Sequence, residues 1–120
     1  GDARSGRIMN WKEGDTEKNP FVHIWDIKAK DPKAFASAQK KFTDSASSLF
    51  TDRVVGFGTY DINKPNGATH WSLVTGKDVN DHLGLISEVQ ENKAFKVYIQ
   101  NRGEVEQIHD FVVEVLKRYQ

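Results

Sequence analysis

The chain of 120 residues contains no cysteine. It therefore has no disulfide, no thiolate nucleophile and no cysteine-ligated zinc site. Seventeen basic residues balance seventeen acidic ones, and no run of Lys or Arg makes a local patch. Because no positive field attracts phosphates or an anionic lipid surface, neither nucleic acid nor a membrane is expected as a partner. No apolar run approaches the roughly 18 residues that span a bilayer, so no membrane helix is expected.

The sequence does contain enough apolar residues for one folded domain. They make up 38% of the chain, and charged residues make up 28%, a balance typical of a folded domain rather than of a disordered chain. Residues 1–20 are polar and aperiodic, so they are predicted to form an N-terminal extension, ordered only where Ile8, Met9 and Trp11 find a surface. Residues 21–120 are predicted to form a single domain. The chain begins with GDAR rather than Met, as a chain does after removal of a leader, so a periplasmic or secreted location is an expectation.

The first half of the domain shows alternating strand and helix patterns. Residues 21–29, FVHIWDIKA, are apolar on both alternating faces, which is typical of a strand covered on both sides. Asp31 and Pro32 follow as an N-cap and first-turn pair, and apolar residues then repeat at helical spacing. Residues 53–62 return to period two, and the turn KPNG leads to a partner strand at 68–76. The pattern therefore predicts a strand, a helix and a hairpin.

The second half predicts two further helical segments and a last strand. Asp78 or Asn80 is expected to cap a helix. The apolar face of that helix is predicted to consist of Leu83, Ile86 and Val89. Asn92 is expected to cap the segment 93–103, whose apolar spacing favours helix, although its alternate residues also fit a strand. The tail 109–119 fits either a helical stripe or a strand, and its valine and aromatic content favours the strand.

The order strand, helix, hairpin, helical segment, strand is the βαββαβ plan of the ferredoxin-like α+β fold, with a four-stranded antiparallel sheet. From about residue 21 to 119 the chain resembles the dimeric α/β-barrel superfamily, which includes antibiotic-biosynthesis-type monooxygenases and stress-responsive barrel proteins. The stretches that carry the resemblance are FVHIWDIKA, VVGFGTY, THWSLVTG and NKAFKVYIQNRGEV. The resemblance implies that two sheets pack face to face in a dimer, that helices cover the outsides, and that ligands bind between each sheet and its helices.

The two apolar faces of the predicted sheet point to the same dimer without the resemblance. Helices on one face cannot cover the other, yet residues 21–29 and 111–119 place large apolar side chains on both. A second copy of the chain is the simplest cover. Burying a few hundred Å2 of apolar sheet contributes on the order of 10 kcal/mol before association costs, at about 25 cal/mol per Å2. The sequence therefore predicts a homodimer through the sheet face.

Candidate ligand-binding residues lie on the predicted strands. They are His23, Trp25, Tyr60, His70 and Trp71. A histidine can act there as acid, base or hydrogen-bond donor, and a tryptophan supplies a flat apolar wall, although each is also a common core or interface residue. His70 and Trp71 point to opposite faces of a regular strand, so at most one of them faces a given pocket. Tyr60 faces the same way as Gly56 and Gly58, where absent side chains leave room for a small cavity.

No catalytic or metal-binding set is recognised. There is no G-x-S-x-G elbow, and the four histidines lack a spacing such as H-x-H or H-E-x-x-H, so no metal is expected. His82 and His109 are expected to be exposed or capping residues. Haem-degrading members of the superfamily carry a Trp six positions before and a His four positions after the Phe of their short helix. Aligning that Phe with Phe95 places Val89 and Ile99 there, so neither haem nor another cofactor is expected.

The leading interpretation is a small-ligand-binding protein of the dimeric α/β-barrel type, which takes an apolar or aromatic ligand and has no recognised catalytic set. One alternative is a cofactor-independent monooxygenase or isomerase of aromatic or polyketide-like molecules, in which one of the histidines or tryptophans named above holds and deprotonates the substrate. A purely structural dimer is the other alternative. Arg53 and Arg102 are candidates to pair with a carboxylate ligand, although surface ion pairs are the commoner use of arginine. The sequence leaves open the ligand's identity and which sheet face lines the pocket.

Overall fold

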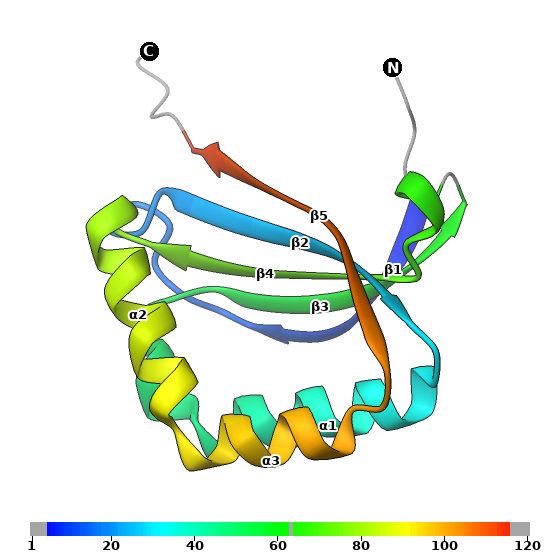
Figure 1. Ribbon diagram of the computed structural model, residues 1–120. Coiled ribbons are helices and arrows are strands. Elements are labelled where there is room, and N and C mark those ends of the chain that lie inside the picture. Colours follow the sequence, from blue (N-terminus) through cyan, green and yellow to red (C-terminus); the bar gives the residue numbers. More distant parts are fainter. Residues whose placement is uncertain (1–4, 63, 116–120) are drawn as a thin grey trace.

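Antiparallel strands form one sheet in the order β1-β3-β4-β2-β5, within the residues that the structure describes, 5–62 and 64–115. In this computed structural model the strands are β1 (Ser5–Lys12), β2 (Phe21–Ala29), β3 (Val55–Ile62), β4 (His70–Gly76) and β5 (Val105–Glu114). The helices are α1 (Pro32–Ser45), α2 (Val79–Glu91) and α3 (Lys93–Asn101), with short 3-10 turns η1 (Ser47–Phe50) and η2 (Pro65–Gly67). Figure 1 shows how these elements are arranged.

The order β3-β4-β2-β5 of the last four strands is the ferredoxin-like arrangement, and it confirms the predicted fold class. β2 leads through α1 to β3, the chain returns as β4 between β3 and β2, and α2 and α3 then lead to β5 on the other side of β2. The sheet differs from the prediction in its strand number, because the described residues contain five strands instead of four. The additional strand is β1.

β1 lies within the stretch 1–20, which the sequence predicted to be an extension outside the sheet. It pairs antiparallel with the edge of β3. A register shift between Ile8 and Asn10 interrupts this pairing, and such a bulge breaks the period of two by which a strand is recognised in a sequence. The Asn10 amide also donates to the Thr43 hydroxyl, 3.1 Å away, and so ties β1 to α1.

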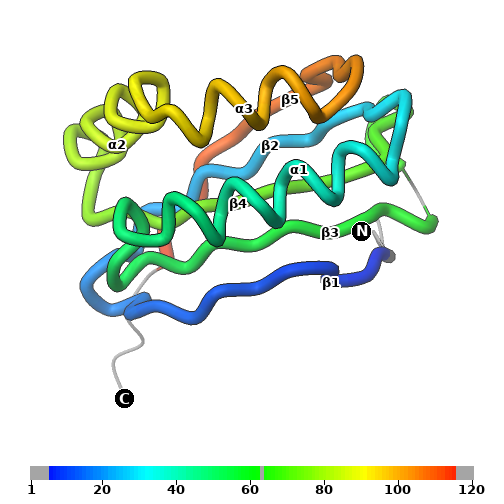
Figure 2. Tube along the Cα trace, turned by 90° about the horizontal axis from the view of Figure 1, so that it is seen from below, coloured from blue at the N-terminus to red at the C-terminus, as the bar shows by residue number. Residues whose placement is uncertain are grey.

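All the described helices lie on the same face of the sheet. Figure 1 shows them on one side of the strands, and Figure 2 shows α1 and α3 running along that face. Since successive side chains of a strand alternate between faces, β2 turns Phe21, His23, Trp25 and Ile27 toward the helices. No described helix covers the opposite face, which is called the open face below. Within residues 5–62 and 64–115, no helix has the length and apolar character to cross a bilayer.

The N-caps that the sequence predicts are present. Side-chain oxygens accept backbone N–H bonds at Asp31 from Ala34 (3.1 Å), at Asp78 from Asp81 (2.9 Å) and at Asn92 from Ala94 (2.8 Å). Asp78 rather than Asn80 therefore caps α2, and Asn92 separates α2 from α3. The helix favoured within 93–103 is confirmed, and β5 confirms a strand in the tail. The predicted continuation of that strand through 116–119 lies outside the described residues.

Two apolar clusters fill the layer between the sheet and the helices. Their buried members are Ala46, Phe50, Val55, Val74 and Leu85 in one, and Ile27, Ala29, Phe35 and Phe57 in the other. His82 and Leu85 are the buried residues of α2, whereas Leu83, predicted for that face, is 58% exposed. The turn before β4 has the predicted positive φ angles, 51° at Asn66 and 82° at Gly67.

Candidate functional site

A cavity of about 370 Å3 lies between the sheet and the three helices. Its apolar lining includes Trp25, Ile27, Phe35, Phe42, Phe50, Leu85, Ile86, Val89 and Phe95. Its polar lining consists of Gln39, Thr43, Ser72, Gln90, Tyr98, Arg102 and Gln107. The sequence did not decide which face of the sheet lines the pocket. The structure places the cavity on the face that the helices cover. The cavity is mostly apolar with a few polar groups, which is the usual composition of a small-molecule site.

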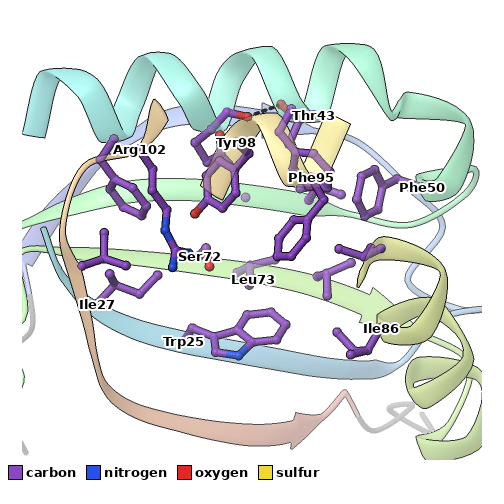
Figure 3. Close-up of a pocket in the computed structure, with 18 of the residues that line it drawn as sticks. Trp25, Ile27, Thr43, Phe50, Ser72, Leu73, Ile86, Phe95, Tyr98 and Arg102 are labelled. Atoms are coloured by element: carbon purple, nitrogen blue, oxygen red, sulfur yellow. Dashed lines mark hydrogen bonds between the residues drawn. The ribbon is translucent and has the colours of Figure 1, made fainter. Parts of the chain in front are cut away.

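The two ends of the cavity differ in their side chains. Figure 3 shows Arg102 and Tyr98 reaching toward Ser72 at one end, while Phe50 and Ile86 lie at the other end. Trp25 lies on the sheet side. The charged group of the cavity lining therefore lies at the end near the C-terminus of α3, whereas the end near α2 is lined mainly by apolar side chains together with Gln90.

The C-terminus of α3 positions the two polar side chains. The backbone N–H of Arg102 donates to the Tyr98 carbonyl at 2.9 Å, so Arg102 ends the helix. Its guanidinium carbon lies 5.3 Å from the centre of the Tyr98 ring, within the range of a cation–π contact. Burial raises the pKa of the Tyr98 phenol. Tyr98 is therefore a neutral hydroxyl at neutral pH, available to donate a hydrogen bond.

A hydrogen-bonded chain of His82, His23 and Asp110 lies beside the cavity and is called the histidine chain below. His23 Nδ1 lies 2.7 Å from His82 Nε2, and His23 Nε2 lies 2.7 Å from Asp110 Oδ2. If His23 Nε2 donates to the carboxylate and the ring is neutral, its Nδ1 accepts from His82 Nε2–H. His82 Nδ1 is then an acceptor, and it is buried without a hydrogen-bond partner among the described residues.

His82 is 3% exposed, so the prediction that it is an exposed or capping residue is wrong. The reason is its position one turn before Leu85, on the face of α2 that packs against the sheet. Burial lowers the pKa of His82, and the nearby charges of His23 and Arg53 lower it further. Arg53 in turn holds Asp81 through two hydrogen bonds of 2.7 and 3.0 Å, and this contact lowers the pKa of the Asp81 carboxyl.

Trp25 separates the histidine chain from the cavity. The His23 ring stacks on the Trp25 indole with ring centres 3.9 Å apart and an interplanar angle of 24°. Trp25 lines the cavity, whereas neither histidine of the chain does. The histidine chain can therefore influence a bound molecule through the position of Trp25, but it does not touch the cavity directly.

The other three candidate residues lie away from the cavity. His70 faces the helices but is buried against Phe35 and Phe57, where burial lowers its pKa. Tyr60 lies on the open face, and its hydroxyl donates to Asp26 Oδ1 at 2.5 Å. Trp71 also lies on the open face, so the prediction that His70 and Trp71 point to opposite sides agrees with the strand register.

The room that the sequence predicted beside Tyr60 is filled by two indoles. A Cβ atom built on Gly56 would lie 2.7 Å from the Trp11 ring, and one built on Gly58 would lie 2.4 Å from the Trp71 ring. The glycines are thus needed so that the tryptophans can lie flat on the sheet. These rings occupy the predicted room, and the cavity described above lies on the other face of the sheet.

The open face carries many large apolar side chains and no described helix. Its large side chains are Ile8, Trp11, Val22, Ile24, Trp71, Leu73, Phe111 and Val113. Trp11 is 41% exposed and Val113 is 44% exposed. Within residues 5–62 and 64–115, no cluster of three or more His, Asp or Glu side chains could hold a metal ion.

No protein-family model matches the chain, and no curated protein matches it significantly. Among solved structures, the fold is similar to a protein of Lactobacillus acidophilus NCFM that is provisionally described as a monooxygenase, with a TM-score of 0.53 and 17% identity. The similarity covers 88% of this chain and 46% of that chain, so this chain spans about half of the neighbour's length. At this level of identity the likeness concerns the fold, and it supports the ferredoxin-like α+β architecture.

Proposed function

We propose that the protein binds a small apolar or aromatic molecule in the cavity between the sheet and the helices. The observation that carries the proposal is the cavity itself, about 370 Å3 in volume and lined largely by aromatic and aliphatic side chains. Small-molecule sites commonly have volumes of about 300–1,000 Å3 and this kind of lining. The polar groups near Arg102 would fix the orientation of the bound molecule.

The cavity also argues against a purely structural role. Protein interiors are packed as densely as organic crystals, and empty spaces much larger than a water molecule are few and destabilising. A protein that served only as a structural dimer would gain stability by filling this volume with side chains. A cavity of this size is therefore better accounted for by a ligand.

We also propose that the protein forms a homodimer in which two open faces pair. The apolar side chains of the open face support this proposal. Contiguous exposed apolar surface of this kind is uncommon on monomers and marks an interaction site. The acidic and basic residues of the chain balance, so two copies carry no net charge that would oppose pairing. In the similar structure, more than half of the chain lies outside the matched part, which leaves room for a second unit of this size.

A ligand screen with a matched pair of variants tests the binding proposal. A panel of aromatic and aliphatic metabolites is expected to raise the thermal unfolding temperature of the wild-type chain, because a ligand that binds only the native state stabilises it. Val89→Phe places a larger side chain in the cavity lining and is expected to abolish the shift. Leu83→Phe, at an exposed position of the same helix, is the control, and ligands should still raise its unfolding temperature. No shift with any member of the panel would support the structural dimer instead.

The histidine chain favours a cofactor-independent monooxygenase as a second candidate function. In such a reaction an activated CH2 group of an aromatic substrate reacts with O2 to give a carbonyl group and water, so the substrate itself supplies the electrons. The histidine chain holds a buried proton acceptor at His82, which is linked through His23 to Asp110, and Asp110 is 57% exposed. Because Trp25 separates this acceptor from the cavity, a substrate proton would reach it through a bridging water. The similar structure is also that of a protein provisionally described as a monooxygenase.

Oxygen consumption separates this candidate from simple binding. A monooxygenase consumes O2 only when the substrate is present, and His23→Asn is expected to lower that rate without abolishing ligand binding, since His23 does not line the cavity. His109→Asn, an exposed histidine of the adjacent strand, is the matched control. Binding of aromatic ligands without any oxygen uptake would remove the monooxygenase and leave the binding function.

A further inference from the structure

Arg102 is the charged residue of the cavity lining within the described part of the chain. It is half-buried, and its side chain turns into the cavity across Tyr98 rather than out into water. A cation at the C-terminus of a helix interacts favourably with the helix dipole even when it is fully solvated. The dipole alone therefore does not account for the direction that this side chain takes.

No acidic side chain balances this charge inside the cavity. The lining residues include neither Asp nor Glu. The nearest acidic residue along the chain, Glu104, pairs with Lys30 at 3.2 Å. Among residues 5–62 and 64–115, no carboxylate lies within ion-pair distance of the Arg102 guanidinium. A partly desolvated guanidinium without a counter-charge is costly, and an anionic ligand would offset that cost.

The neighbours of Arg102 would complete an anion site. Ser72 and Gln107 line the cavity with it, and the side chains of both residues can donate hydrogen bonds. Figure 3 shows Arg102 extending toward Ser72, so that guanidinium and hydroxyl converge on one end of the cavity. The opposite end, where Phe50 and Ile86 lie, is mainly apolar, with Gln90 as a neutral polar group. A molecule that satisfies both ends has an anionic head and an apolar body.

We propose that the ligand of this cavity is a monocarboxylic acid with an aromatic or aliphatic body, whose carboxylate pairs with Arg102. The inference rests on the proposed function, because it requires that the cavity hold a small molecule. The planar fork of a guanidinium matches the two oxygens of a carboxylate. A single cation balances a single negative charge, whereas the roughly double charge of a phosphate monoester would leave an excess in an apolar site.

Two aromatic probes of the same shape test the charge preference. 2-Naphthoate is anionic at pH 7.5 and 2-naphthamide is neutral, and calorimetric titration of the full chain measures both dissociation constants. The wild type is expected to bind the naphthoate about tenfold or more tightly than the amide, since hydrogen bonds to charged groups are the stronger ones. Arg102→Gln is expected to remove this preference, because it weakens binding of the naphthoate much more than binding of the amide.

Two further variants test whether the preference depends on the positive charge, on the planar shape of the guanidinium or on the charge of the helix as a whole. Arg102→Lys keeps the positive charge but not the planar fork, so part of the preference for naphthoate should remain. Lys96→Gln removes one charge from an exposed position of the same helix and should leave both constants unchanged. Circular dichroism checks that each variant keeps the wild-type helix content.

The outcomes also distinguish this inference from the function on which it rests. Equal binding of the two probes by the wild type, or a preference for naphthoate that survives in Arg102→Gln, would overturn the carboxylate assignment. If only the neutral probe binds, the carboxylate assignment is also overturned, but the proposed binding function stays intact. If neither probe nor any member of the metabolite panel binds, both proposals fall together.

Discussion

His23 Nδ1 lies 2.7 Å from His82 Nε2, and this contact joins β2 to α2 at the end of the cavity layer. His23 also contacts Asp110 on β5, so a single imidazole links three elements. Because His23 stacks on Trp25, the same ring helps to fix one wall of the cavity. The same titratable groups therefore contribute both to the stability of the fold and to the shape of the cavity.

Lowering the pH from about 7.5 to 5.5 is expected to lower the free energy of unfolding. Burial lowers the pKa of both His70 and His82 below the ordinary 6.5. Below pH 6.5 the unfolded chain then binds more protons than the folded one, and stability is lost as the pH falls toward the folded pKa values. Near His82, His23 and Arg53 oppose protonation and Asp81 favours it. Urea unfolding at a series of pH values and fixed protein concentration measures the slope.

A His70→Gln variant is expected to show a smaller dependence on pH than the wild type, because it removes one of the two buried histidines. Burial is the cause of the His70 shift, so its contribution should be separable from that of the histidine chain. The control is His109→Gln, which changes an exposed histidine. Identical slopes in His70→Gln and in the wild type would contradict this assignment.

Asp81→Asn is expected to lower the free energy of unfolding by about 1–3 kcal/mol, because it leaves Arg53 without its charged partner. The Arg53 side chain is 13% exposed and is held by both Asp81 oxygens. Since Arg53 lowers the pKa of Asp81, the stabilisation is present above the ordinary value of 3.8 and is lost as the pH falls below it. Asp61→Asn, in an exposed pair with Arg7, should change stability by less than about 0.5 kcal/mol.

Gly58→Ala is expected to destabilise the sheet by about 1–3 kcal/mol, as overpacking does in a dense region. The added Cβ would lie 2.2 Å from the Arg7 carbonyl oxygen and 2.4 Å from the Trp71 ring. Gly84→Ala on α2 is the matched control, because nothing lies within 4 Å of the added atom. That change should instead stabilise the chain by about 0.4–1 kcal/mol. Chemical unfolding of the two variants should therefore give shifts of opposite sign.

Phe111→Asp is expected to convert the proposed homodimer into monomers, because it places a charge on the open face, next to Ile24 of β2. Sedimentation equilibrium at micromolar concentration measures the change. Leu83→Asp, on the exposed side of α2, alters another exposed apolar residue and should leave the dimer intact. A wild-type chain that sediments as a monomer throughout this range would contradict the proposed pairing of open faces.

The elements of the fold could be predicted because their signals are local. Asp31, Asp78 and Asn92 each lie directly before an apolar helical pattern, and each caps the helix that it was expected to cap. β1 could not be predicted in the same way. Its bulge interrupts the alternation, and its polar composition resembles that of an extension.

The site was less predictable, since its groups come together only in the folded chain. His23 lies 59 residues from His82 and 87 residues from Asp110, a separation that no motif spacing reveals. Of the five candidate residues, Trp25 lines the cavity. Tyr98 was not singled out as a site residue, although its spacing from Arg102 places both on one face of a helix, and that spacing was the signal available.

The three tryptophans of the chain are divided between the cavity and the open face. Trp25 borders the cavity, whereas Trp11 and Trp71 lie over the glycines of the open face. Intrinsic fluorescence can therefore report on ligand entry and on subunit assembly as separate optical signals. A variant that keeps Trp25 alone would follow the first event, and one that lacks only Trp25 would follow the second.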